Sequence, residues 1–247
     1  MKLTVEQVYN KLVNDDEILT KKGQITFTLG DIDITVKQRD VVGNIMQEWI
    51  EGWLKKNNID YSLNNNTQMP PDFYLDPENK TEGLMEIKAF NYRGSPGFDI
   101  ADFRMYAREI SEKPWMLNVT YLIFGYVMSD DGIVTIKQVW QKKVWEMSRP
   151  MKSGNNKTIW PINLQIKEGT VHKMRPAKWY GRATSFSIFE NMEDFLAAME
   201  ETMYKNKDTR NDAPDWLQKV LYSYQKHYGV RLQIPRWSEI ASKYVNR

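Results

Sequence analysis

One continuous apolar run constrains the fold of this chain more than any other segment. Residues 121–127 read Tyr-Leu-Ile-Phe-Gly-Tyr-Val, which predicts a strong β-strand over residues 119–128. A turn of Ser and Asp follows, and a second strand is expected at 133–139. Apolar residues recur with helical spacing in other parts of the chain, at 4–19, 40–55, 98–110, 191–203 and 215–228. This mixture of predicted strands and helices indicates an α/β fold. The composition does not shift along the chain, so we expect a single domain over residues 1–247.

The residue types that are absent narrow the possible chemistry. The chain has no cysteine and only two histidines, His172 and His227. Disulfide scaffolds, thiolate zinc sites and Cys nucleophiles are therefore excluded, and His-rich metal sites are disfavoured. No apolar run approaches the roughly 18–20 residues that span a bilayer, so we expect a soluble, cytoplasmic protein without a membrane partner. Carboxylates, lysines and hydroxyls must carry any catalysis.

Two acids and a lysine lie around a predicted β-hairpin. Asp72 follows Pro71, while Glu86 and Lys88 stand two residues apart in the apolar run 84–90. Alternate residues of a strand share a face, so Glu86 and Lys88 project together, and the hairpin can return Asp72 beside them. Two converging carboxylates favour a hard divalent cation such as Mg²⁺, with the backbone carbonyl of Ile87 as a further ligand.

This set of residues predicts phosphodiester hydrolysis. A bound cation neutralises charge that develops on a phosphodiester and lowers the pKa of a water molecule, and Lys88 can orient or help deprotonate that water. The alternative is structural, with Glu86 and Lys88 as an ordinary exposed strand pair. An otherwise apolar strand argues against it, because an unpaired ammonium group there would be costly to bury.

A basic segment is the second candidate feature. Residues 141–182 contain ten Lys or Arg and two acids, a net charge of +8, interleaved with Trp and Tyr and broken by Pro, Gly and Asn. We interpret it as a loop-rich DNA-recognition region whose cations follow phosphates or reach guanine bases. The candidate DNA-binding residues are Arg149, Lys152, Asn155, Asn156, Lys157, Arg175, Lys178 and Arg182, together with Arg93 in the loop after the acid-bearing strand.

The pattern Pro71-Asp72, then Glu86-x-Lys88, resembles the PD-(D/E)XK nuclease superfamily. That resemblance implies a mixed β-sheet flanked by helices, the restriction endonuclease-like core. It also implies that an acid from a preceding helix completes the site. Glu48, on the polar side of the helix that follows Asp40, is our candidate for supporting the metal or the water. Glu51 is the fallback.

The resemblance narrows further to type II restriction endonucleases. The order of Glu48, Asp72 and Glu86-x-Lys88 resembles the EcoRV-type arrangement, although Asp is the more usual first residue of the last motif. Residues 36–48, 69–73, 97–103 and 121–126 resemble the NgoBV/NlaIV group, with a match that extends to about Lys178. This group implies Mg²⁺-dependent cleavage of both strands of double-stranded DNA at a GGNNCC-type palindrome by a homodimer. A cognate DNA methyltransferase is expected in the same system.

Two other functions stay open from the sequence. One is a repair or junction-resolving nuclease of the same superfamily, which would cut by DNA structure rather than by base sequence. The other is a non-catalytic DNA-binding module with a degenerate site. The intact set of Asp72, Glu86 and Lys88 favours an enzyme. Helices after residue 191 could dimerise or close the core.

Overall fold

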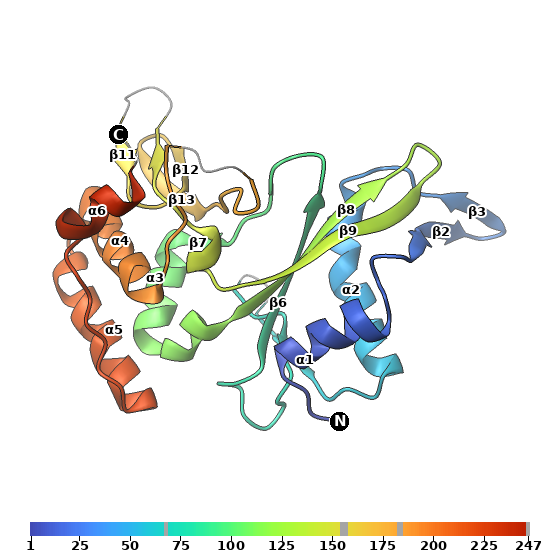
Figure 1. Cartoon of the computed structure of the whole chain (residues 1–247), viewed down its shortest axis with the longest axis horizontal. Helices are drawn as coiled ribbons and strands as arrows, with labels where there is room; N and C mark the ends of the chain where they lie inside the picture. Colours follow the sequence, from blue (N-terminus) through green and yellow to red (C-terminus); the bar gives the residue numbers. More distant parts are fainter. Residues whose placement is uncertain (67–68, 154–157, 182–184, 246–247) are drawn as a thin grey trace. The chain divides into compact units, whose positions relative to one another are not determined.

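The computed structural model describes residues 1–66, 69–153, 158–181 and 185–245 (Figure 1). The chain forms two compact units that interleave along the sequence. The first unit comprises Met1–Phe98 and Thr120–Lys142, and the second comprises Asp99–Val119 and Lys143–Arg247. The single nuclease domain inferred from composition stays a prediction. Within the described residues, no helix is both long enough and apolar enough to cross a bilayer.

A six-stranded mixed sheet forms the centre of the first unit, as expected for an α/β fold (Figure 1). Strands β6 and β8 are parallel, and the other neighbours are antiparallel. The apolar run identified in the sequence is β8, and it lies between β6 and β9. In spatial order the strands are β1 (Lys22–Gln24), β9 (Ile133–Lys142), β8 (Thr120–Met128), β6 (Leu84–Asn91), β5 (Phe73–Tyr74) and β4 (Ser62–Leu63).

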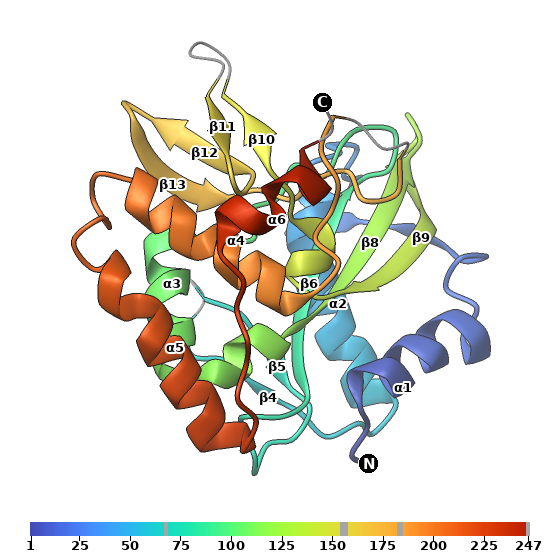
Figure 2. The ribbon, with the colours of Figure 1, turned by 60° about the vertical axis from the view of Figure 1, so that its left-hand side comes forward.

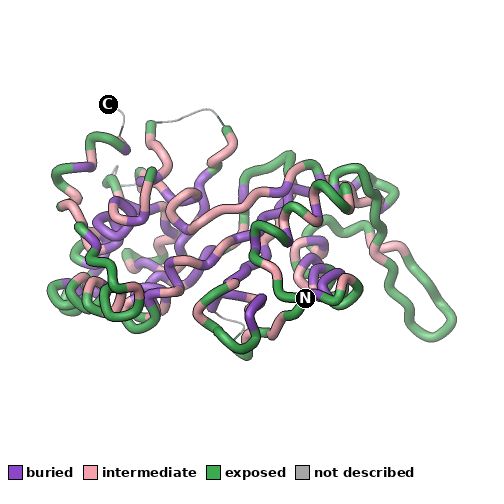
Figure 3. The backbone as a smooth tube through the Cα atoms, turned by 60° about the horizontal axis from the view of Figure 1, so that its bottom comes forward, coloured by how far each residue is buried: buried purple, intermediate pink, exposed green. Residues whose placement is uncertain are grey.

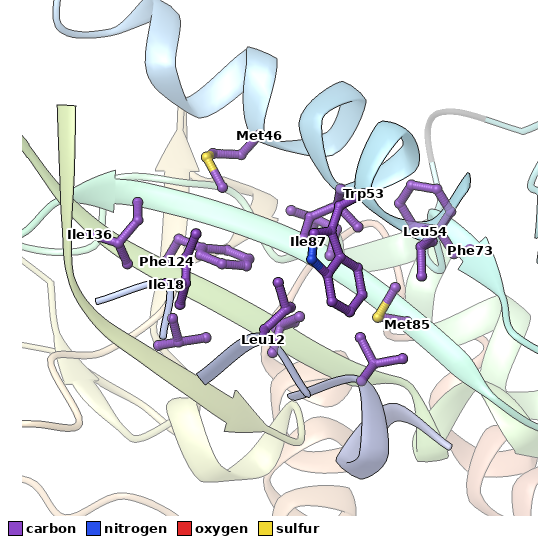
Figure 4. Close-up of a cluster of buried hydrophobic side chains, with 14 of the residues drawn as sticks. Leu12, Ile18, Met46, Trp53, Leu54, Phe73, Met85, Ile87, Phe124 and Ile136 are labelled. Carbon is purple, nitrogen blue, oxygen red and sulfur yellow. The ribbon is translucent and has the colours of Figure 1, made fainter. Parts of the chain in front are cut away.

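Two helices accompany this sheet. The pattern Thr4-x-x-Gln7 predicts a helix cap, and helix α1 (Val5–Asn10) begins there. Thr4 accepts from the amide of Gln7, and the Gln7 side chain accepts from the amide of Thr4. It continues as a π-helical turn over Lys11–Asp15. Helix α2 (Val41–Lys56) contributes Met46, Trp53 and Leu54 to an apolar cluster with residues of β6, β8 and β9 (Figure 4).

The buried face of α2 differs from the stripe that the sequence spacing indicated. The spacing places Val41, Ile45, Trp49, Gly52 and Trp53 on one face of the helix. Of these, Trp53 is buried, whereas Val41 and Ile45 are only partly covered and Trp49 is 41% exposed. The buried side chains are Val42, Met46, Ile50, Trp53 and Leu54. Both stripes are apolar, so helical periodicity alone did not identify which one faces the sheet.

A second, smaller sheet in the first unit is the hairpin of β2 (Thr26–Leu29) and β3 (Ile32–Thr35). Alternating apolar residues over 24–36, interrupted at Gly30-Asp31, predict a strand pair or a bent strand, and the structure has the strand pair. Gly30 takes a φ of +63° at the first position of the two-residue turn, a conformation that suits glycine.

The second unit combines short sheets with helices (Figure 2). Asp102 caps α3 by accepting from the amide of Met105, and Asn191 caps α4 by accepting from the amide of Asp194. The sequence pattern predicted α4 and α5 but missed α6. The elements are β7 (Ala101–Asp102), α3 (Phe103–Glu112), a 3₁₀ turn (Pro114–Asn118), a second 3₁₀ turn (Trp145–Met147), β10 (Met151–Lys152), β11 (Ile159–Trp160), β12 (Leu164–Lys167), β13 (Thr170–Met174), α4 (Met192–Lys205), α5 (Ala213–Tyr228) and α6 (Trp237–Tyr244).

Candidate active site

The predicted hairpin brings the two acids together. Strands β5 and β6 are antiparallel, and Phe73 pairs with Met85. Asp72 therefore stands opposite Glu86, one position further along the ladder. The Asp72 carboxylate accepts a hydrogen bond from the backbone amide of Ile87 through Oδ2 at 2.8 Å. The prediction that Asp72 returns beside β6 is confirmed by this contact.

Glu86 and Lys88 share one face of β6, as their spacing predicts. The Lys88 Nζ atom lies 2.7 Å from Oε1 of Glu86. The Glu86 side chain is 5% exposed and that of Lys88 is 23% exposed, so this ion pair is largely removed from water. The structural alternative of an exposed strand pair is therefore wrong.

Burial dominates the electrostatics of both acids. It raises the pKa of Glu86 to about 7, an effect that Lys88 opposes and the nearby Asp72 charge reinforces. Burial also raises the pKa of Asp72, against the hydrogen bond from Ile87 and the charge of Lys88. One ammonium group thus faces two carboxylates that are costly to ionise. A bound cation would lower both pKa values.

The available oxygen atoms suit a hard cation. Oε2 of Glu86 is buried and has no hydrogen-bond partner among the described residues. In a strand, the N–H and C=O groups of one residue point to the same side. Since the Ile87 N–H donates to Asp72, the Ile87 carbonyl also faces that edge. Carboxylate and carbonyl oxygens together are the ligands that Mg²⁺ accepts.

Helix α2 does not bring Glu48 to the two acids. Glu48 is exposed, on the face of α2 opposite the buried side chains, and the described residues contain no group of three or more acids or histidines that could hold a metal. The fallback, Glu51, is engaged elsewhere, with Tyr61 at 2.9 Å and Lys55 at 2.7 Å. These two contacts lower the pKa of Glu51.

One turn of α2 passes close to β6. A Cβ atom on Gly43 would stand 3.7 Å from the carbonyl oxygen of Ala89, so this turn of α2 passes close to the strand. Gln47 follows one helical turn later on the same side and is half-buried. The sequence spacing places Gln47 and Glu48 together, on the flank and opposite side of the apolar face. Gly43 is the sequence feature that distinguishes Gln47 from Glu48, because a small residue permits the close approach of α2 to β6 on the side of Gln47.

Two of the candidate DNA-binding arginines already have partners within the second unit. Arg149 donates to the carbonyl of Phe186 at 3.4 Å, and burial lowers the pKa of its guanidinium group. Arg175 forms a short ion pair with Asp99. These contacts orient both side chains, and a guanidinium group presents its five N–H donors in a fixed planar geometry.

The other candidates are mostly exposed or lie outside the described residues. Lys152 is exposed on β10, and Arg93 is exposed in the loop after β6. Lys178 is exposed, with its Nζ atom 5.3 Å from the centre of the Tyr180 ring. The candidates that fall outside the described residues are Asn155, Asn156, Lys157 and Arg182.

The mixed sheet, with two acids and a lysine on one of its hairpins, defines a nuclease with a restriction endonuclease-like core. Comparisons with known proteins support this class. The chain belongs to the NgoBV restriction endonuclease family, whose model matches residues 2–244. It is 53% identical over 248 residues to the type II restriction enzyme NlaIV of Neisseria lactamica, covering 100% of both chains. It is 46% identical over 183 residues to the type II restriction enzyme NgoBV of Neisseria gonorrhoeae, covering 74% of this chain and 99% of the relative.

The structural comparison gives the same answer. A solved structure of the NlaIV restriction endonuclease superposes with a TM-score of 0.95 and 52% identity, covering 100% of this chain and 98% of that one. The chain is therefore a site-specific endonuclease of type II. Of the functions that the sequence left open, the restriction endonuclease is supported over a structure-specific nuclease or a non-catalytic module.

Proposed function

We propose that this chain hydrolyses both strands of double-stranded DNA at a GGNNCC-type palindrome, using Mg²⁺, as a homodimer. The observation that carries the catalytic part is the buried carboxylate pair, in which one oxygen of Glu86 has no partner among the described residues. The recognition sequence is inherited from the resemblance to the NgoBV/NlaIV group. A methyltransferase of the same specificity would protect the host DNA, and a cytoplasmic enzyme would meet incoming DNA directly.

In this proposal Asp72, Glu86 and the Ile87 carbonyl hold the cation. When bound, Mg²⁺ neutralises charge on the scissile phosphate and lowers the pKa of a water molecule. The amide of Ile87 fixes the orientation of Asp72, which keeps its carboxylate at the edge of β6. Buried surroundings exclude competing water and strengthen each interaction with the cation.

Lys88 positions the attacking water in this proposal. Its ammonium group is anchored to Oε1 of Glu86, so the side chain is held near the acids. An ammonium group is an N–H donor that carries positive charge, so at this position it can direct a water molecule toward the phosphorus atom. Lys88 also compensates part of the negative charge of the pair, since its charge lowers the pKa of both acids.

Glu48 remains a proposed support for the metal or the water. Its substitution Glu48→Gln tests that role against Gln47→Ala, one position away on α2. A loss of cleavage with Glu48→Gln alone would assign Glu48 to the site. Full activity with Glu48→Gln, combined with a loss for Gln47→Ala, would transfer the role to Gln47, which is half-buried.

Contacts to DNA are proposed for the nine candidates given by the basic segment and Arg93. We expect the exposed Lys152, Lys178 and Arg93 to contact DNA phosphates. An exposed cation that neutralises a phosphate releases a counterion from the DNA, and this contact does not depend on the base sequence. Arg149 and Arg175 are oriented by protein contacts and suit bidentate pairing with guanine O6 and N7. Asn155, Asn156, Lys157 and Arg182 complete the proposed set.

Digestion of unmethylated DNA tests this function. Purified protein is incubated with phage DNA at about 10 mM Mg²⁺, which fills a weak carboxylate site, and in parallel with EDTA. We expect discrete fragments with Mg²⁺ alone, and sequenced ends that map to GGNNCC. Fragments that map to another palindrome would overturn the inherited specificity. Discrete cutting in EDTA would overturn the metal requirement.

A further inference from the structure

The sheet face that carries Glu86 and Lys88 continues beyond them along β6. Phe90 lies two residues after Lys88 in the strand, so its side chain is on the same face. The amide of Tyr92 donates to the carbonyl of Tyr126 on β8 at 2.8 Å, which extends the pairing of the two strands by one residue. Tyr92 therefore shares this face, about 13 Å from Lys88 at a rise of roughly 3.3 Å per residue.

Aromatic rings from two strands stack on this face. Trp140 of β9 pairs with Ile123 of β8, which in turn pairs with Lys88, so Trp140 points to the same side of the sheet. Its ring stacks with that of Phe90 at a centroid distance of 5.7 Å and an interplanar angle of 17°. It also stacks with the ring of Tyr92, at 6.1 Å and 22°. The position of Tyr92 is thus supported by a ring from another strand.

Gly125 of β8 makes room for these rings. A Cβ atom at this position would lie 2.8 Å from Cδ2 of Tyr92 and 3.0 Å from two ring atoms of Trp140, so both rings lie directly against the backbone. The pairing of β8 with β9 also shifts register between Gly125 and Tyr126. Irregularities of this kind are common beside active sites, where they redirect side chains. The local backbone therefore fixes where the two rings lie.

Exposure to solvent increases along this row of rings. Phe90 is 4% exposed, Trp140 is half-buried and Tyr92 is 39% exposed. The chain then enters a turn, in which the amide of Arg93 donates to Oδ1 of Asn91 at 3.1 Å. Tyr92 is therefore an accessible aromatic side chain whose backbone and ring are both held in place, next to an exposed cation.

The other exposed aromatic residues among the described part of the first unit have different surroundings. Phe27 lies on the β2–β3 hairpin, which is exposed along almost its whole length (Figure 3). Residues 24–36 of that hairpin contain two acids and no Lys, Arg or His. Trp49 lies on α2, which packs against the opposite face of the sheet. Only Tyr92 lies on the face of the acids, and residues 89–98 around it contain an arginine and no acid.

DNA is the occupant that fits this surface. The proposed function places a scissile phosphate at Glu86 and Lys88, on the same face of the same strand. The major groove alone is about 12 Å wide, so a duplex that reaches Lys88 also covers surface about 13 Å away. Contact between a nucleotide and an aromatic side chain tolerates any base, and the neighbouring Arg93 adds attraction for phosphate.

We propose that Tyr92 packs against a nucleotide close to the scissile phosphate and holds the DNA in register with the metal site. Trp140 supports the Tyr92 ring on the protein side. This contact places the phosphate and does not read the base sequence. The inference rests on the proposed function and deepens it by assigning a residue that contacts the DNA beside the cut.

Single-turnover cleavage tests the role of the ring. Tyr92→Ala removes the ring, Tyr92→Phe keeps it, and Tyr222→Ala removes a 70% exposed tyrosine of α5 as the control. At saturating protein we expect Tyr92→Ala to cleave at least about 10-fold more slowly than the wild type, because a displacement of about 1 Å at the reacting groups costs up to about 100-fold. Tyr92→Phe and Tyr222→Ala should cleave like the wild type. Equal rates for Tyr92→Ala and Tyr222→Ala would overturn the proposal.

The dependence on Mg²⁺ separates this role from damage to the metal site. The Mg²⁺ concentration that gives half the maximal rate should be the same for Tyr92→Ala and the wild type, since Tyr92 lies about 13 Å from Lys88. A higher Mg²⁺ requirement that accounts for the whole loss of rate would show that the ring supports the acids and does not position DNA. That result would also overturn the proposal.

Cross-linking to DNA tests the contact itself. The chain has no cysteine, so Lys88→Ala/Tyr92→Cys has a single thiol and leaves the DNA intact. The duplex contains the cut site mapped with the wild type, and an activated disulfide tether is placed on one nucleotide at a time. We expect cross-links from the nucleotides nearest the cut, and none with Lys88→Ala/Tyr222→Cys. An absence of cross-links near the cut would overturn the proposal alone. Wild-type cleavage at a sequence other than GGNNCC would fail the proposed specificity and leave this contact to be measured on the mapped site.

Discussion

Two β-hairpins of the first unit depart from the usual distribution of residues in opposite ways. The β5–β6 hairpin buries charge, because Glu86 is 4% exposed and Asp72 lies beside it. The β2–β3 hairpin exposes apolar groups, with Leu29 72% and Ile32 64% accessible. Both segments have the same local design of alternating residues around a turn. They differ in what their faces contact.

Each departure carries a free-energy cost in the isolated chain. A buried carboxylate with an unbonded oxygen carries a desolvation cost that a cation can repay. An uncovered apolar ribbon carries a hydration cost that a second apolar surface can remove. The comparison teaches that buried charge and exposed apolar groups carry different costs, and that the role of the buried acids can be tested by cation binding and by pH dependence.

The largest expected effect is the loss of DNA cleavage when the acids or the lysine of the β5–β6 hairpin are replaced. Asp72→Asn, Glu86→Gln and Lys88→Ala should each lower the cleavage rate by at least about 100-fold, because each removes a metal ligand or the group that orients water. DNA binding should persist, since the basic residues are untouched. Rates are measured under single-turnover conditions and binding by gel retardation.

Glu82→Gln is the matched control for these variants. Glu82 is an exposed acid in the turn of the same hairpin, so its loss should leave the rate unchanged. Cleavage by Asp72→Asn or Lys88→Ala at the rate of Glu82→Gln would remove those residues from the site.

The next effect is on stability as a function of pH. Burial raises the pKa of Glu86 from 4.5 to about 7, so between these values the folded protein binds more protons than the unfolded chain. The free energy of unfolding of the metal-free protein should therefore fall as the pH rises through this interval, by on the order of a few kcal/mol. The raised pKa of Asp72 acts in the same direction.

Urea unfolding in EDTA at pH 5 and pH 8 measures this change. Glu86→Gln should flatten the pH dependence, and Glu82→Gln should retain it. An equal slope in the wild type and Glu86→Gln would show that Glu86 does not titrate in the expected range.

The smallest expected effect is that of an exposed lysine. Such a charge adds affinity for DNA and carries no cost of desolvation by burial. Lys152→Ala should weaken DNA binding modestly and reduce the slope of log affinity against log salt by about one, as expected for a single phosphate contact. Lys56→Ala, an exposed lysine of α2, is the control and should leave the slope unchanged. Equal slopes for both variants would place Lys152 away from the phosphates.

The acid-bearing hairpin could be predicted from the sequence because its information is local. A turn, an alternating strand and a spacing of 14 residues suffice to bring Asp72 to β6. The cap at Thr4 and the strand β8 were accessible for the same reason. Each depends on neighbours within a few residues or on a continuous apolar run.

The features that were missed depend on contacts between distant segments. Helix α2 has two apolar stripes, and only the packed fold selects the one through Met46 and Ile50. That selection also decides that Glu48 is exposed while Gln47 is half-buried. The exposure of the β2–β3 face is likewise invisible in its sequence, because alternation of residues normally predicts burial.

Cation binding by the buried acids tests the central claim most directly. Mn²⁺ can be titrated into the protein–DNA complex and followed by electron paramagnetic resonance, with Lys88→Ala as the background so that the DNA stays intact. We predict that Lys88→Ala binds Mn²⁺ and that Lys88→Ala/Asp72→Asn and Lys88→Ala/Glu86→Gln lose this binding, whereas Lys88→Ala/Glu82→Gln retains it. Equal Mn²⁺ binding by all four proteins would contradict the assignment of Asp72 and Glu86 as the metal site.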